Sequence, residues 1–159
     1  MKLILIRGPP GAGKSTIALE LAKKLKKCVV IPKDSIVYGF HFVNIKQDKH
    51  KSQAVINSSV NYYLKNKINV IVEGVFGGST PMKKINELKK IALKNKAEFV
   101  LINLDVELKD AIKRNNKRDM SDYAVRKYYK HYYQKKIKGL TINTSELNKK
   151  EILNLLQSI

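Results

Sequence analysis

Residues 3–26 read LILIRGPPGAGKSTIALELAKKLK, and the segment GPPGAGKST at 8–16 fits the phosphate-loop pattern G-x-x-x-x-G-K-[ST] without a mismatch. The apolar run at 3–7 before it is short, as expected of a strand buried on both faces. The apolar residues after it recur at helical spacing over 15–26. The pattern binds phosphate only when it joins a strand to a helix, and it does so here. This context favours a nucleotide-binding loop over an incidental glycine-proline turn.

Each residue type in such a loop has its own task. Glycines allow the backbone N–H groups to turn inward around phosphate oxygens. A lysine supplies a mobile positive charge between the β- and γ-phosphates, the following hydroxyl ligates Mg²⁺, and the helix N-terminus adds the positive end of its dipole. We therefore expect ATP and Mg²⁺ as cofactors. The expected nucleotide contacts come from Gly8, Gly11, Ala12, Gly13, Lys14, Ser15 and Thr16, with Ser15 as the Mg²⁺ ligand.

Size and composition predict one globular domain over residues 1–159. The chain has 159 residues, 43% hydrophobic and 28% charged, and no apolar run approaches the roughly 20 residues that span a bilayer. The first apolar run stops at Arg7 and is too short for a secretion signal. A lone Cys28 cannot form an internal disulfide, so we expect a cytoplasmic protein. The three histidines do not cluster at metal-ligand spacing, so no structural metal site is indicated.

The formal net charge of +19 makes nucleic acid a candidate partner. The alternative is a solvated lysine surface, because 28 of the 32 basic residues are lysines. Where lysine is the default cation, each arginine calls for an explanation. Three of the four arginines, Arg114, Arg118 and Arg126, fall within 13 residues.

The rest of the chain alternates strands and helices. Strands are expected at 28–31, 70–72, 99–102 and 140–142, and helices at 48–66, 81–95, 106–115, 124–133 and 147–159, the last with Leu147, Ile152, Leu155 and Leu156 facing inward. Thr80 and Pro81 are typical of a helix N-cap and first helical position. Strands separated by helices pair in parallel, because each return crosses a sheet face. The pattern predicts a three-layer α/β fold with a five-stranded parallel sheet.

Two acidic residues follow strands at the edge where ligands bind in open α/β sheets. Asp34 comes just after the second strand and is a candidate general base for an attacking hydroxyl; alternatively it only caps or turns the chain. Glu73 ends the third strand and could hold a Mg²⁺-bound water or orient the substrate, or be an ordinary loop acid. The glycine-rich segment 74–79 that follows could line a substrate cleft or simply form a turn.

Arg114 and Arg118 are four residues apart, so they share a face if the helix continues through both. Arginine offers a planar fork for phosphate oxygens that lysine cannot match. The functional interpretation is that both neutralise the γ-phosphoryl group in the transition state. The alternative is a solvated basic helix end.

These residues together resemble the small P-loop kinase group, which includes polynucleotide 5′-kinases, zeta-toxin-type kinases, AAA-type kinases and antibiotic phosphotransferases. The resemblance lies in GPPGAGKST, the acid after the second strand, the Glu-Gly pair ending the third, and LDVELKDAIKRNNKR after the fourth. It is greatest to the 5′-kinase domain of polynucleotide kinase. It implies a P-loop NTPase fold of the nucleoside/nucleotide kinase kind, with a helical lid at about 114–130.

The resemblance also implies residue roles. It makes Lys14 and Ser15 the phosphate and Mg²⁺ ligands, Asp34 the general base and Arg118 the lid arginine, supported by Arg114. Asn143 falls where the family's backbone passes the adenine. Val37 departs from the pattern, because polynucleotide kinases carry an arginine there to hold the 3′-phosphate of the acceptor.

The sequence thus favours an ATP- and Mg²⁺-dependent kinase with Lys14, Asp34, Arg114 and Arg118 as catalytic residues. A 5′-hydroxyl nucleic acid or nucleoside-like molecule is the first candidate acceptor. A sugar, antibiotic or metabolite is the second. A nucleotide-binding ATPase or switch without an acceptor is the rival from another class.

Overall fold

The computed structural model describes residues 1–39, 49–116 and 120–157. Its strands are β1 (Lys2–Arg7), β2 (Cys28–Pro32), β3 (Asn69–Gly74), β4 (Glu98–Asp105) and β5 (Leu140–Asn143). Its helices are α1 (Lys14–Lys24), α2 (Lys33–Tyr38), α3 (Lys49–Lys65), α4 (Pro81–Lys94), α5 (Leu108–Asn115), α6 (Asp122–Tyr133) and α7 (Lys149–Leu155). Within these ranges, no helix is long and apolar enough to cross a membrane.

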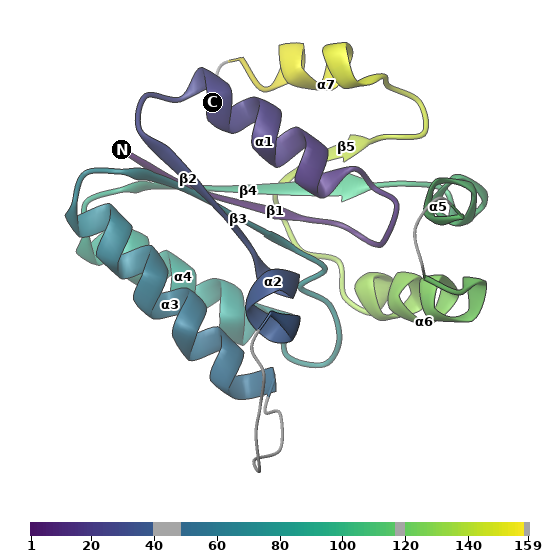
Figure 1. Ribbon diagram of the computed structural model, residues 1–159, viewed down its shortest axis with the longest axis horizontal. Helices are drawn as coiled ribbons and strands as arrows, with labels where there is room; N and C mark the ends of the chain where they lie inside the picture. Colours follow the sequence, from purple (N-terminus) through teal and green to yellow (C-terminus); the bar gives the residue numbers. More distant parts are fainter. Residues whose placement is uncertain (40–48, 117–119, 158–159) are drawn as a thin grey trace.

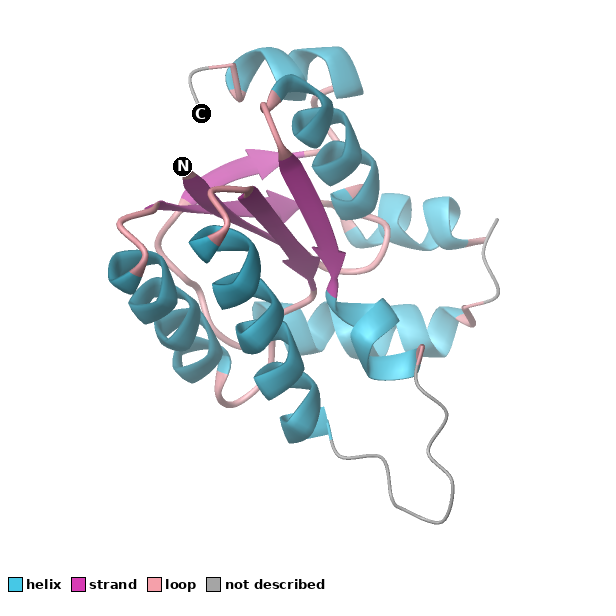
Figure 2. Ribbon diagram, turned by 60° about the vertical axis from the view of Figure 1, so that its left-hand side comes forward, coloured by secondary structure: helices cyan, strands magenta, loops and turns pink. Residues whose placement is uncertain are grey.

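The five strands form one parallel sheet in the order β2-β3-β1-β4-β5. Helices α1 and α7 cover one face and α3 and α4 the other, so the sheet is the middle of three layers (Figures 1 and 2). Helices α5 and α6 lie beyond the carboxyl ends of the central strands, on the right of Figure 1. The predicted three-layer α/β fold with five parallel strands is confirmed.

The alternation of side chains along β1 divides the core between the two faces. Ile4 and Ile6 join the cluster under α1 and α7, whereas Leu3 and Leu5 join the cluster under α3 and α4. All four are fully buried, because a central parallel strand is covered on both faces. Arg7 ends β1 on the same face as Leu3 and Leu5, at the place where the phosphate loop begins.

The C-terminal helix departs from its prediction. Helix α7 begins after Asn148, which forms a capping box with Glu151, and ends at Leu155 rather than continuing to 159. Leu155 was expected to face inward but is 55% exposed. Because Ile152, Leu153 and Leu156 set the face that meets the core, Leu155 falls at its outer edge.

Helix α4 begins as the sequence predicted, with Thr80 at the N-cap and Pro81 in the first turn. The Thr80 side chain makes no capping hydrogen bond, however. The proline therefore supplies the start signal at this helix, through its fixed backbone angle.

Candidate functional site

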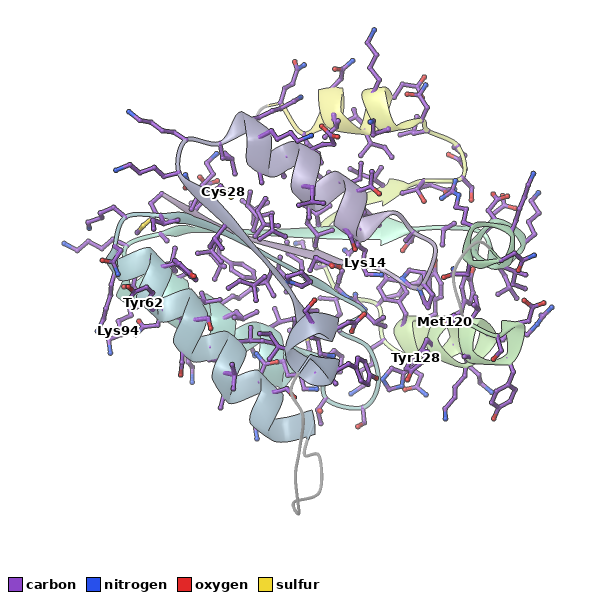
Figure 3. All side chains as sticks on the ribbon, viewed as in Figure 1. Lys14, Cys28, Tyr62, Lys94, Met120 and Tyr128 are labelled. Atoms are coloured by element: carbon purple, nitrogen blue, oxygen red, sulfur yellow. The ribbon has the colours of Figure 1, made fainter. Side chains whose placement is uncertain are left out.

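A cavity of about 380 Å³ opens at the carboxyl ends of the strands. The phosphate loop, α2, the end of β3 and helix α6 all contribute to its wall. In Figure 3, Lys14 lies on the same side of the molecule as Met120 and Tyr128, which also line the cavity, whereas Cys28 lies at the other end of the sheet. The cavity brings together these residues singled out in the sequence: Gly11, Gly13, Lys14, Ser15, Asp34, Val37 and Glu73.

The phosphate loop has the backbone conformation that its glycines permit. Gly11 and Gly13 both have φ of +78°, in the left-handed region that side chains with a Cβ disfavour. A Cβ on Gly8 would lie 2.5 Å from the Leu104 carbonyl oxygen, so this glycine allows the loop to pass close to β4. Ala12, between Gly11 and Gly13, is fully buried. The predicted loop therefore wraps the N-terminus of α1, where anions are favoured.

The two polar side chains after the loop already have partners inside the protein. The Lys14 ammonium donates a hydrogen bond to the Pro9 carbonyl oxygen, with an Nζ–O distance of 3.0 Å. The Ser15 hydroxyl donates to the Glu73 carboxylate, with an Oγ–Oε1 distance of 2.9 Å. Both side chains are thus held at the cavity wall before any ligand arrives.

Glu73 fits a role at a hard cation. It is only 5% exposed, and in the sheet it lies between Pro32 of β2 and Ile6 of β1. A hydroxyl and a carboxylate, both oxygen donors, are the ligand types that Mg²⁺ takes, directly or through water. The Ser15–Glu73 pair therefore offers oxygen donors of the kind that Mg²⁺ takes.

Asp34 lies in the first turn of α2 and lines the cavity. The N-cap of α2 is Pro32, so the alternative that Asp34 itself caps the helix is wrong. The side chain is exposed, which leaves it accessible to a substrate hydroxyl. One turn later, Val37 is 4% exposed and also lines the cavity, so the position expected to carry an arginine presents an apolar wall.

Two tyrosines that the sequence did not single out face this part of the cavity. Tyr38 of α2 is 59% exposed, yet partial desolvation of its hydroxyl, a hydrogen bond with Tyr128 of α6 and the charge of Asp34 raise its pKa to about 12. Tyr38 therefore keeps its proton to a higher pH than an ordinary tyrosine. The contact links α2 to α6 across the cavity.

The glycine-rich segment after β3 docks on the end of α6. The Gly78 N–H donates to the His131 carbonyl oxygen at 2.9 Å, and Gly78 has φ of +88°. A Cβ on Gly77 would lie 2.6 Å from the same oxygen. Val75 and Gly77 line the cavity, so part of this segment forms its wall. The Gly78 N–H, however, donates its hydrogen bond to the protein backbone and not to the cavity.

Of the predicted arginine pair, Arg114 lies in the last turn of α5, which ends at Asn115, and Arg118 lies outside the described residues. Arg114 donates to the Gly11 carbonyl oxygen at 3.2 Å. It also donates to the Thr144 hydroxyl at 3.1 Å and to the Thr144 carbonyl oxygen at 2.7 Å. Arg114 thus ties the phosphate loop to the segment that follows β5.

Arg114, Arg126 and Asn143 do not line the cavity. Arg126 is an exposed residue of α6. The Asn143 side chain donates to Glu146 at 2.7 Å and accepts from the Ser145 N–H at 3.0 Å. It therefore shapes the turn after β5, the segment to which Arg114 is tied.

Sequence reasoning missed several residues of the cavity wall. Besides the two tyrosines, these are Lys33, Lys84, Asn115, Met120 and His131. They come from four different parts of the chain and follow no spacing rule. The tyrosine-rich sequence of α6 was a signal, but nothing in it fixes which tyrosine faces the site.

Structural comparison places the fold among kinases. The gluconokinase of Sinorhizobium meliloti 1021 superposes with a TM-score of 0.68 at 14% identity, over 96% of this chain and 87% of that chain. The APS kinase CysC of Mycobacterium tuberculosis, determined with AMPPNP and APS, gives 0.67 at 17% identity, over 98% and 97%. A chain of the Pnkp1/Rnl/Hen1 RNA repair complex gives 0.62 at 21% identity, over 82% of this chain and 43% of that chain.

These similarities confirm the predicted resemblance to small P-loop kinases. Sequence comparison with curated proteins gave no significant match. The family model for the chromatin associated protein KTI12 matches residues 1–151. Because that match covers most of the sequence, the chain belongs to the KTI12 family.

Proposed function

We propose that this protein is a phosphotransferase that moves the γ-phosphoryl group of ATP to a hydroxyl acceptor in a Mg²⁺-dependent reaction. The observation that carries the proposal is that Asp34 lines the same cavity as Lys14, Ser15 and Glu73. A P-loop alone would serve an ATPase equally well. A carboxylate beside it supplies what an acceptor hydroxyl needs, which is a group to take its proton.

In the proposed reaction the acceptor oxygen attacks the γ-phosphorus while the bond to the β–γ bridging oxygen breaks, and ADP leaves. The Asp34 carboxylate accepts the hydroxyl proton. Lys14 and the loop N–H groups hold the phosphate oxygens. When bound at Ser15 and Glu73, Mg²⁺ would supply charge neutralisation between the β- and γ-phosphates.

Arg114 supports the site by fixing the phosphate loop against Thr144. Arg118 remains a proposed lid residue that would stabilise the transferring phosphoryl group. Asn143 would shape the turn after β5, the segment that we propose lies beside the adenine of the nucleotide.

The acceptor has two candidates. The +19 charge and the likeness to the RNA repair complex support a 5′-hydroxyl nucleic acid or nucleoside-like molecule. The cavity itself supports a small metabolite, because about 380 Å³ is the size of a small-molecule pocket. Its acceptor side also includes apolar Val37, Val75 and Met120.

The test is Asp34→Asn, with transfer of labelled γ-phosphate from ATP to a panel of 5′-hydroxyl RNA and DNA, nucleosides, sugars and aminocyclitols. We expect transfer to fall by roughly 10²- to 10⁴-fold while ATP binding is unchanged. Asp122→Asn is the matched control, since Asp122 also lies in the first turn of a helix but outside the cavity wall. ATP hydrolysis that no acceptor stimulates and that Asp34→Asn leaves intact would instead support an ATPase or switch.

A further inference from the structure

A second cavity, of about 480 Å³, lies between the end of α6, the segment 135–139 and strands β1, β4 and β5. It shares no lining residue with the first cavity. We propose that this second cavity binds a small phosphate-bearing anion. The inference is independent of the acceptor of the proposed kinase reaction, because none of the residues assigned to that reaction line this wall.

The centre of the second cavity is Arg7, which is 2% exposed. Its Nη1 donates to the Asn103 side-chain oxygen at 3.2 Å, and its Nη2 donates to the Tyr132 carbonyl oxygen at 3.4 Å. The guanidinium carbon lies 4.2 Å from the centre of the Tyr132 ring. These contacts are long or neutral, so they satisfy the guanidinium only in part.

Among the described residues, Arg7 lacks two partners: an acceptor for one of its N–H groups and a carboxylate for its charge. Its Nε–H is buried without a hydrogen-bond acceptor among the described residues. No carboxylate within the described ranges comes within 4.0 Å of the guanidinium. A buried charge without an ion partner is costly, and an anion in the adjoining cavity would offset that cost.

The nearest acid is already engaged. Asp105 lines the same cavity, but its Oδ1 accepts a hydrogen bond from the Tyr132 hydroxyl, with an O–O distance of 3.0 Å. Burial lowers the pKa of Arg7, while Tyr132 and Asp105 partly oppose this shift. Asp105 therefore moderates the charge of Arg7 at a distance and leaves its donors free of a carboxylate contact.

The wall carries more positive than negative charge. Lys135, Lys136 and Lys138 join Arg7 against the single Asp105. A planar guanidinium fork combined with mobile ammonium groups suits an oxyanion with several charged oxygens, such as a phosphate ester or a diphosphate. A small molecule fits better than a nucleic acid backbone, because Arg7 is only 2% exposed and lies in the wall of a cavity of about 480 Å³.

The experiment is an NMR titration of the ¹⁵N-labelled protein with inorganic pyrophosphate at constant ionic strength. We expect saturable shifts of the amides of Lys138, Gly139 and Thr141 and of the Arg7 Nε–H. Shifts at Lys14 and Ser15 report the phosphate loop separately, so the two sites are read in one experiment. If the loop fails to bind phosphate, the proposed kinase function is refuted without affecting this site.

Variants test the wall directly. Lys136→Gln should weaken pyrophosphate binding by about two- to fivefold, whereas Lys130→Gln, an exposed lysine of α6 outside the wall, should leave it unchanged. Arg7→Lys keeps the charge but loses the fork and should weaken binding at least about tenfold, with circular dichroism confirming the fold. Three results would each overturn the proposal. They are shifts that do not saturate, an equal loss of binding in both lysine variants, and a protein that binds a short single-stranded RNA but not pyrophosphate.

Discussion

The pairing of Ser15 with Glu73 allows a quantitative prediction for Glu73→Gln. Glutamine keeps the length of the side chain and an oxygen that can accept the hydrogen bond from the Ser15 hydroxyl, so the packing at the end of β3 is preserved. It removes the negative charge. We expect weaker Mg²⁺-dependent nucleotide binding without loss of stability.

The distances set the size of the effect. The Ser15 Oγ lies 2.9 Å from the Glu73 Oε1, and a Mg²⁺ ion about 2.1 Å from that Oγ is no more than about 5 Å from the carboxylate. The attraction between charges of +2 and −1 at about 5 Å is roughly 1.7 kcal/mol in bulk water and about 7 kcal/mol at an effective dielectric constant of 20. Even the smaller figure predicts a weakening of about 15-fold.

The assay is competition binding of a fluorescent ATP analogue at a series of Mg²⁺ concentrations, with urea unfolding of the same samples. The free energy of unfolding should be unchanged or higher, because a buried neutral amide costs less to desolvate than a buried carboxylate. Glu98→Gln is the control, since Glu98 lies at the start of β4 and is exposed there beside Lys2. An unchanged Mg²⁺ dependence in a variant that still binds nucleotide would refute the assignment of Glu73.

Two further predictions concern the glycine-rich segment 74–79 and the Cys28 thiol. Gly78→Ala should lower the free energy of unfolding by about 1 to 3 kcal/mol, since φ there is +88° and a Cβ would meet the His131 ring; urea melts should show little change for Ser79→Ala, and an equal effect of both would contradict the reasoning. Burial raises the pKa of the Cys28 thiol to about 11 from 9.0, so iodoacetamide should alkylate it about 100-fold more slowly at pH 8 than a free thiol. The folded form keeps this proton between pH 9 and 11 while the unfolded form loses it, so wild-type stability should fall faster over that range than that of Cys28→Ala.

The sheet and half of the site were predictable from local patterns. The apolar run before the phosphate loop identified β1, and the parallel arrangement followed from the helices between strands. Because the carboxyl ends of parallel strands meet at one edge, Asp34 and Glu73 could be placed near Lys14 from their positions alone. The cavity lining confirms that placement.

The other half depends on how distant segments pack, which periodicity does not encode. Tyr38 of α2 and Tyr128 of α6 meet across the cavity, although they come from distant parts of the chain. The Arg114 contacts depend on Gly11 and Thr144, which lie far from it in the sequence. Arg7 was overlooked because a charged residue at the end of an apolar run is typical of an exposed strand terminus, and its burial depends on Tyr132, more than a hundred residues away.

The central position of β1 has a consequence for how the protein is made. Its Leu3 pairs with Val70 on one side and with Phe99 on the other, so both neighbours are synthesised long after it. At about 5 to 20 residues per second, translating the intervening hundred or so residues takes roughly 5 to 20 s. Until β3 and then β4 have been made, the apolar side chains of β1, which end up without any contact with water, lack their neighbours in the sheet. Closure of the sheet around β1 is therefore a late event on the ribosome, and chaperones that bind extended apolar segments have their longest opportunity at this strand.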